Sequence, residues 1–173
     1  MQLGFLDFET YWSPTHSLDK MLPSKYVMHP DTEIISCSLA INNEAPTCVF
    51  GENEVRYLLS QVDWSDAAAV GHNLSGFDAM VMAWRFGIHP RVWACTMAMA
   101  RPIHRYDGLS LAALSLRYGL GVKDNSVLVA TKGRHLCDFT EEELREMAVY
   151  NNGDTTKARG LFNIFKPVTP ARE

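Results

Sequence analysis

The pattern of apolar and polar positions along the chain predicts short strands interspersed with helices. Apolar or alternating runs bounded by turn-forming residues are typical of strands, and such runs cover residues 3–10, 33–42, 46–50, 67–71 and 92–97. Apolar residues three and four positions apart are typical of helices, and this spacing covers residues 52–61, 77–87, 109–118 and the C-terminal part of the chain. Residues 11–32 are expected to be irregular, apart from one helical turn at 18–22, because prolines interrupt them. The second and third strands are expected to form an antiparallel meander.

The last helix carries a clear start signal and an interruption of its apolar face. Thr140 followed by Glu143 is a capping box. The residues that share the core-facing stripe are Leu144, Met147, Ala148, Asn151, Asp154, Ala158, Leu161, Phe162 and Phe165. A carboxylate facing a core must be paired or bind a ligand, and Tyr150, one turn before Asp154, can reach the same space. Alternatively, residues 151–153 end one helix and Asp154 caps the next.

The first strand contains two carboxylates, Asp7 and Glu9, within an apolar run. Side chains alternate between the faces of a strand, so Asp7 and Glu9 project to one side while Leu6 and Phe8 project to the other. Two acids held that close need a cation between them, and oxygen ligands favour Mg²⁺ or Mn²⁺ over Zn²⁺. An edge strand with both acids in water is the alternative.

A further acid, Asp78, opens the helix predicted at 77–87. The residues expected to pack this helix on the sheet recur at helical spacing: Phe77, Met80, Val81 and Trp84. Asn73 or Ser75 is expected to cap the helix. Asp78 in the first turn also suits the helix macrodipole, which favours an acid there without any ligand.

Length and composition indicate one domain. The chain has 173 residues and is 47% hydrophobic, which suits a single domain over residues 1–173. The four cysteines lack the close spacing of a zinc knuckle or redox motif, so they are expected to be reduced thiols, as in a cytosolic protein. No apolar run approaches the ~20 residues of a membrane span, and the first residues do not resemble a signal peptide. Neither a membrane partner nor a leader is therefore expected.

Charge is distributed unevenly along the chain. The net charge is -4, yet residues 91–135 hold seven Lys or Arg against two Asp, a local balance of +5 that leaves -9 for the rest. This division suits a protein that holds cations at one place and a polyanion beside it. A solvated basic face without a ligand is the alternative.

Three motifs, in their order and spacing, resemble the exonuclease motifs of the DEDD superfamily, tyrosine branch. They are Asp7-Phe8-Glu9, the stretch from Asn73 to Asp78, and Tyr150-Asn151-Asn152-Gly153-Asp154. Further stretches at residues 25–34 and 109–123 look like the N-terminal 3′-5′ proofreading exonuclease domain of phage family A DNA polymerases. The resemblance covers most of residues 3–162.

The resemblance implies an α/β fold of the ribonuclease H-like kind, a mixed sheet flanked by helices. It also implies removal of nucleotides from a DNA 3′ end, preferably single-stranded, with two divalent metal ions, Mg²⁺ or Mn²⁺. Asp7 should bridge both ions, Glu9 and Asp154 should complete the first site, Asp78 should hold the second, and Tyr150 should orient water. The residues expected to contact the terminal nucleotide are Thr10, His72, Asn73 and Phe77. For His72 a structural hydrogen-bonding role, and for Phe77 a place in the core, are the alternatives.

Two departures from the family pattern leave the function partly open. Cys95 stands before Thr96 where many relatives carry an acid, and no polymerase domain follows in this chain. The chain is thus expected to be either an excised domain or a free-standing exonuclease, with a DNA polymerase domain or subunit as a partner, in the cytoplasm of a phage-infected bacterium. An exoribonuclease of the same superfamily and a catalytically inactive nucleic-acid or polymerase-binding domain are the alternatives.

Overall fold

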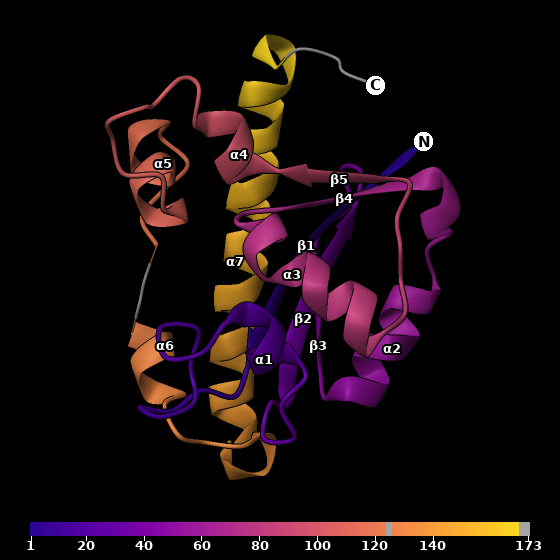
Figure 1. The fold of residues 1–173 in the computed structure, drawn as a ribbon, viewed down its shortest axis with the longest axis vertical. Helices are drawn as coiled ribbons and strands as arrows, with labels where there is room; N and C mark the ends of the chain where they lie inside the picture. Colours follow the sequence, from indigo (N-terminus) through magenta and orange to yellow (C-terminus); the bar gives the residue numbers. More distant parts are fainter. Residues whose placement is uncertain (124–125, 170–173) are drawn as a thin grey trace.

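A five-stranded mixed sheet forms the centre of the computed structural model, which describes residues 1–123 and 126–169 (Figure 1). The strands are β1 (Gln2–Thr10), β2 (Ile34–Ile41), β3 (Thr47–Phe50), β4 (Ala67–Gly71) and β5 (Val92–Cys95). They lie in the order β3-β2-β1-β4-β5. The pairs β3-β2 and β2-β1 are antiparallel, whereas β1-β4 and β4-β5 are parallel. The prediction of an α/β fold with a mixed sheet is confirmed.

Helices cover both faces of this sheet (Figure 1). The helices are α1 (Pro23–Val27), α2 (Glu52–Ser60), α3 (Asp78–Met80), α4 (Thr96–Ala100), α5 (Leu111–Arg117), α6 (Ser126–Ala130) and α7 (Glu141–Phe165). Short 3₁₀ turns are η1 (Trp64–Asp66), η2 (Leu74–Gly76), η4 (Leu136–Asp138) and η5 (Lys166–Val168), and η3 (Val81–Arg85) is a π-helix. The long helix α7 crosses one face, with α4 and α5 packed on its C-terminal half, while α2, α3 and η3 cover the other face. In the described residues, no helix has both the length and the apolar character that a bilayer span requires.

The alternation of side chains along β1 determines which residues lie on each face of the sheet. Phe5 lies on the α7 side, with its ring centroid 5.6 Å from that of Phe162. Phe8 lies on the other side and stacks on Phe86 at 5.9 Å. Residues of odd number in β1 therefore face α7. Asp7 and Glu9 are among them.

The segment between β1 and β2 contains a helix that the proline argument missed. Residues 11–32 are largely irregular, and the turn near 18–22 is present as hydrogen bonds from the N–H groups of Lys20 and Met21 to the carbonyl of Ser17. However, α1 begins at Pro23. Proline ends a helix in its interior but fits its first position, where the missing N–H has no partner to lose.

The predicted helix at 77–87 differs in form from the expectation. It continues from α3 into the π-helix η3, whose wider turn rotates later residues relative to a 3.6-residue period. Trp84 is consequently 47% exposed, and Met82 and Phe86 are buried in its place. The predicted caps are also wrong: α3 begins after Phe77 without a side-chain cap, because Asn73 adopts a left-handed conformation (φ 56°) that opens η2 instead.

The last helix runs uninterrupted for 25 residues, which excludes a break at residues 151–153. The capping box of Thr140 and Glu143 is confirmed, with the Glu143 N–H donating to Thr140 Oγ1 at 3.3 Å. Tyr150 and Thr155 are buried in addition to most of the predicted stripe, whereas Leu144 and Ala148 are only partly buried. Asp154 therefore faces the sheet from the middle of a continuous helix.

Candidate metal centre

Three carboxylates from two elements meet on the α7 face of the sheet. Asp7 and Glu9 come from β1 and Asp154 from α7, and one oxygen of each lies within 4.8 Å of the others. Asp154 is only 1% exposed, while Asp7 and Glu9 are partly buried. The group lies toward the end of β1, at the edge where parallel strands place their carboxyl ends and where α/β folds place ligands.

Burial and mutual repulsion make this group unfavourable without a cation. Burial, then the charges of Glu9, Asp78 and Asp154, raise the pKa of Asp7 well above its usual value. Burial also raises the pKa of Glu9 to about 8, which Lys123 opposes. Oδ1 of Asp154 is buried without a hydrogen-bond partner in the described part of the chain. Hard oxygen donors that are crowded and desolvated fit a divalent ion such as Mg²⁺ or Mn²⁺.

Asp78 lies beside the group rather than within it. Its Oδ1 accepts a hydrogen bond from the Phe8 N–H at 3.2 Å, which ties the start of α3 to β1. Burial raises the pKa of Asp78 to about 7, although hydrogen bonds from backbone N–H groups counteract this. Its charge in turn raises the pKa of Asp7. Asp78 therefore interacts electrostatically with the carboxylate group and is hydrogen-bonded to β1. The helix macrodipole alone does not account for these contacts.

Tyr150 lies on α7 one turn before Asp154 and is 8% exposed. Its hydroxyl has no hydrogen-bond partner in the residues that the structure describes. Burial, followed by the charges of Glu9 and Asp154, raises the pKa of this hydroxyl above its usual value. Tyr150 is thus protonated at neutral pH and available to donate a hydrogen bond.

Lys123 is a site residue that the sequence placed in the basic stretch and in the resembling stretch 109–123, but not at the carboxylates. Its ammonium group donates to Asp154 Oδ2, and it lies 5.1 Å from the centre of the Tyr150 ring. Its charge lowers the pKa values of Asp7 and Glu9. Lys157 lies 3.7 Å from the other oxygen of Asp154. No local pattern distinguishes Lys123 from other lysines, since the loop that carries it meets α7 only in the folded chain.

A layer of small polar residues supports the carboxylates. Ser38 lies opposite Asp7 in the β1-β2 register, and Ser36 lies opposite Glu9. When the Asn151 amide is oriented to satisfy both its atoms, its nitrogen donates to Oδ2 of Asp7 at 3.2 Å and its oxygen accepts from Ser36 Oγ at 2.9 Å. Ser38 donates to Oδ1 of Asn152 at 2.7 Å. In the sequence, this layer is marked by the alternate serines of β2 and by Asn151 in the otherwise apolar stripe of α7.

The residues predicted to contact a nucleotide separate into two groups. His72 engages both ring nitrogens within the protein, with Thr96 Oγ1 and the Leu109 carbonyl at 2.9 Å each, which favours its structural alternative. Asn73 is exposed beside η2. Thr10 and Phe77, in contrast, line a cavity of about 540 Å³ together with Glu9.

Two cavities adjoin the carboxylates. The walls of the first are largely apolar, and its lining residues are Phe8, Glu9, Thr10, Trp12, Ser17, Leu18, Asp19, Tyr26, Phe77 and Val129. The second has a volume of about 550 Å³ and is lined by Val122, Val127, Glu146, Val149, Tyr150, Gly153, Asp154 and Lys157. A carboxylate of the group thus borders each cavity.

The basic stretch is largely engaged in ion pairs. Arg91 pairs with Asp66, Arg117 with Asp107, Lys123 with Asp154 and Arg134 with Glu143. These pairs reduce the positive charge that residues 91–135 can offer to a polyanion. The alternative of a basic face without a ligand therefore accounts for much of the excess positive charge in this stretch. Lys123 differs from the other basic residues because it lies at the carboxylates.

Substituting Lys123 by Met should increase the affinity for Mn²⁺ and lower thermal stability in a chelator. The ammonium group offsets the repulsion among the acids, and a divalent ion must compete with it for Asp154. One nearby charge in a partly buried site is worth about 1.4 kcal/mol or more, so Kd for Mn²⁺ should fall about tenfold. Calorimetric titration measures Kd, with the exposed Lys20→Met as the matched control. A weaker affinity in Lys123→Met would contradict this competition.

The sequence matches neither a protein-family model nor a curated protein. Its structure is similar to that of Brucella melitensis NrnC, with a TM-score of 0.66 and 14% identity over 95% of this chain and 72% of that one. It is also similar to the family B DNA polymerase from the hyperthermophilic archaeon Pyrobaculum calidifontis, with a TM-score of 0.63 and 12% identity. The latter match covers 96% of this chain but only 25% of the polymerase chain. The fold is ribonuclease H-like. At these identities the similarity concerns the fold, and it confirms the predicted class.

Proposed function

We propose that this protein is a metal-dependent 3′-5′ exonuclease that removes nucleotides from single-stranded DNA ends. The convergence of Asp7, Glu9 and Asp154 on a ribonuclease H-like fold carries the proposal, because these acids come from two of the three exonuclease-like motifs. Asp78, from the remaining motif, adjoins them through its hydrogen bond to Phe8. A proofreading role beside a phage DNA polymerase is the finer form of the proposal, and it rests on the family resemblance of the motifs.

The acids suit two divalent ions with different numbers of protein ligands. Asp7 would bridge both ions, Glu9 and Asp154 would complete the first site, and Asp78 would hold the second. Two such ions supply activation of a water molecule and neutralise charge on the phosphate and the leaving oxygen. Asn151 keeps the Asp7 carboxylate in place. Asp154 is only 1% exposed, so few water molecules would compete with an ion for its oxygens.

The apolar cavity beside Glu9 supports a preference for unpaired ends. Its walls include the aromatic side chains of Trp12, Tyr26 and Phe77, and its volume of about 540 Å³ suits one nucleoside. Trp12 is held there by a 3.0 Å hydrogen bond from its Nε1 to Thr131 Oγ1. A base must leave a duplex to enter such a cavity, which favours a single strand.

Tyr150→Phe should slow hydrolysis while leaving metal affinity nearly unchanged. The protonated hydroxyl is proposed to orient the attacking water, and a hydrogen bond in a buried site is worth about 1.5–3 kcal/mol, or roughly 10- to 150-fold in kcat. Single-turnover kinetics and Mn²⁺ titration measure the two quantities. An unchanged rate would remove Tyr150 from the mechanism.

Digestion of matched 5′-labelled DNA and RNA oligonucleotides tests the proposed function. We expect Mg²⁺-dependent shortening of the DNA from its 3′ end, read directly from the ladder, and loss of digestion in a chelator. Faster digestion of RNA would favour an exoribonuclease. Binding of either oligonucleotide without digestion in Mg²⁺ or Mn²⁺ would favour an inactive binding domain.

A further inference from the structure

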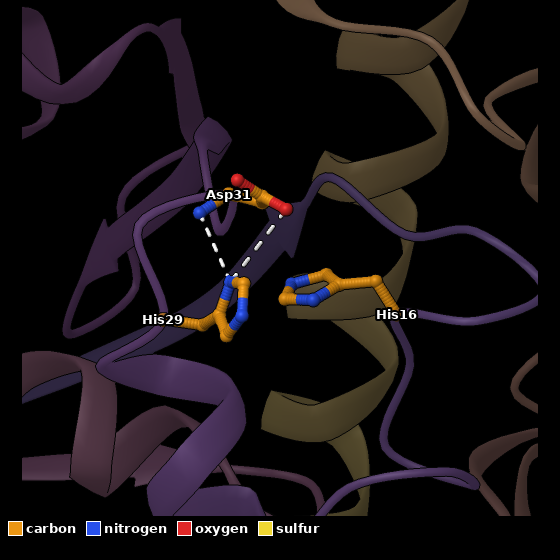
Figure 2. A group of neighbouring side chains, drawn as sticks. All are labelled: His16, His29 and Asp31. Atoms are coloured by element: carbon orange, nitrogen blue, oxygen red, sulfur yellow. Dashed lines mark hydrogen bonds and ion pairs between the residues drawn. The ribbon is translucent and has the colours of Figure 1, made fainter.

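We propose a second metal site, for a transition ion of the Zn²⁺ class, formed by His16, His29 and Asp31. One ligand atom from each of these side chains lies within 4.8 Å of the others. Figure 2 shows the two imidazole rings and the carboxylate, all from the segment that joins β1 to β2, turned toward one another. None of the three belongs to the three exonuclease-like motifs that carry the proposed function, although His29 and Asp31 lie in the stretch 25–34 that also resembles the family.

The geometry holds both histidines in a form that can bind an ion. His16 is only 6% exposed, and its Nε2 lies 2.7 Å from Thr32 Oγ1. The two rings lie 4.7 Å apart between centroids. Thr32 Oγ1 donates to the Tyr26 carbonyl, so it accepts from His16 Nε2–H and leaves the lone pair of His16 Nδ1 for an ion. His29 Nδ1 accepts a hydrogen bond from the Asp31 N–H at 3.2 Å, and an ion bound at this nitrogen would replace that hydrogen bond.

The donor set differs in chemistry from that of the carboxylate centre. Two imidazole nitrogens and one carboxylate oxygen suit Zn²⁺, Co²⁺ or Ni²⁺, whereas the all-oxygen set of Asp7, Glu9 and Asp154 suits Mg²⁺ or Mn²⁺. Three protein ligands leave a position for water in a tetrahedral site. Asp31 carries an exposed carboxylate at 3.8 Å from His29 Nδ1, so an ion can enter from solvent.

An ion at this site would restrict the movement of residues that form one wall of the apolar cavity. The His16 ring lies 4.7 Å from that of Tyr26, which lines the cavity. The Tyr26 hydroxyl in turn bonds Thr10 Oγ1 at 2.8 Å, at the end of β1. Joining residues 16 and 31 would therefore restrain the loop that carries Ser17 and Leu18 into the same cavity.

Titration of the full chain with Zn²⁺, and with Co²⁺ as a spectroscopic probe, tests this site. The Asp7→Asn variant serves as the background, because it weakens binding at the carboxylate centre. We expect one ion with Kd on the order of 1 μM or tighter and Co²⁺ absorption bands of a tetrahedral site with nitrogen ligands. Zn²⁺ should also raise Tm.

Substitutions in the same background separate this site from adventitious binding. His29→Gln changes a partly exposed ring and should weaken Zn²⁺ binding by at least about tenfold, with circular dichroism as the check on folding. His16→Ala should do the same, although its buried ring also contributes to packing. His89→Ala, an exposed histidine elsewhere, should leave the affinity unchanged. Absence of binding, or binding that survives His29→Gln, would overturn the proposal.

Discussion

Asp7→Asn is expected to abolish 3′-5′ digestion in Mg²⁺ while making the metal-free protein more stable. Asp7 lies at the centre of the carboxylate group, where the charges of Glu9, Asp78 and Asp154 raise its pKa. The amide cannot supply the negative charge that holds divalent ions, and a metal contribution of several kcal/mol corresponds to a rate loss of about 10³-fold or more. Asn151 can still donate to the remaining side-chain oxygen.

The gain in stability follows from the same crowding. Removing a carboxyl that, in the metal-free fold, must either take up a proton or stay charged beside other acids should be worth about 1–2 kcal/mol in a chelator, or roughly 3–8 °C in Tm for a domain of this size. Asp66→Asn is the matched control, since that acid is exposed and pairs with Arg91 on the surface. A nuclease rate near that of the unmodified protein would reject the mechanism. A lower Tm in chelator would show that Asp7 is not under electrostatic strain.

The fold was most predictable where a local signal repeats along the sequence. Alternation in β1 predicted the shared face of Asp7 and Glu9, and the Thr140–Glu143 capping box predicted the start of α7. The short strands β3, β4 and β5 lie where they were predicted, whereas helical elements of five residues or fewer were harder to predict, because tertiary contacts decide their form. The π-helix η3 is one example: the 3.6-residue period placed Trp84 in the core, yet it is exposed.

The residues of the candidate site were likewise predictable only where a local signal in the sequence marks them. The acids stand out in the sequence because a carboxylate interrupts an apolar strand or helix face, as Asp154 does in α7. Lys123 has no such signal, because its role depends on an ion pair with Asp154, which lies 31 positions later in the sequence. His16 was not singled out, because residues 11–32 were predicted to be irregular, and His29 stood only in the resembling stretch 25–34, with no period that relates the two histidines.

The metal-free protein is expected to lose stability as pH rises from 6.5 to 8. The pKa of Glu9 is raised to about 8 and that of Asp78 to about 7, so in this range the folded state holds protons that the unfolded chain has already released. Stability falls with pH wherever the folded state binds more protons. The histidines His16 and His72, whose pKa values are lowered from 6.5, act in the opposite sense, but their effect fades as pH rises above 6.5 because the unfolded chain then releases the same protons.

Thermal unfolding in a chelator across this pH range measures the effect. The loss should be about 2 kcal/mol, or roughly 4–8 °C in Tm. Saturating Mg²⁺ should reverse the trend, because the ion binds the ionised carboxylates, and stability should then rise with pH over the same range. Asp7→Asn should flatten the slope in chelator, since the pKa of Asp7 is itself raised well above its usual value and the amide holds no proton that the folded state must release. A Tm that does not change with pH in chelator, with or without this substitution, would mean that the carboxylates are ionised and compensated within the protein, with no need for a divalent ion.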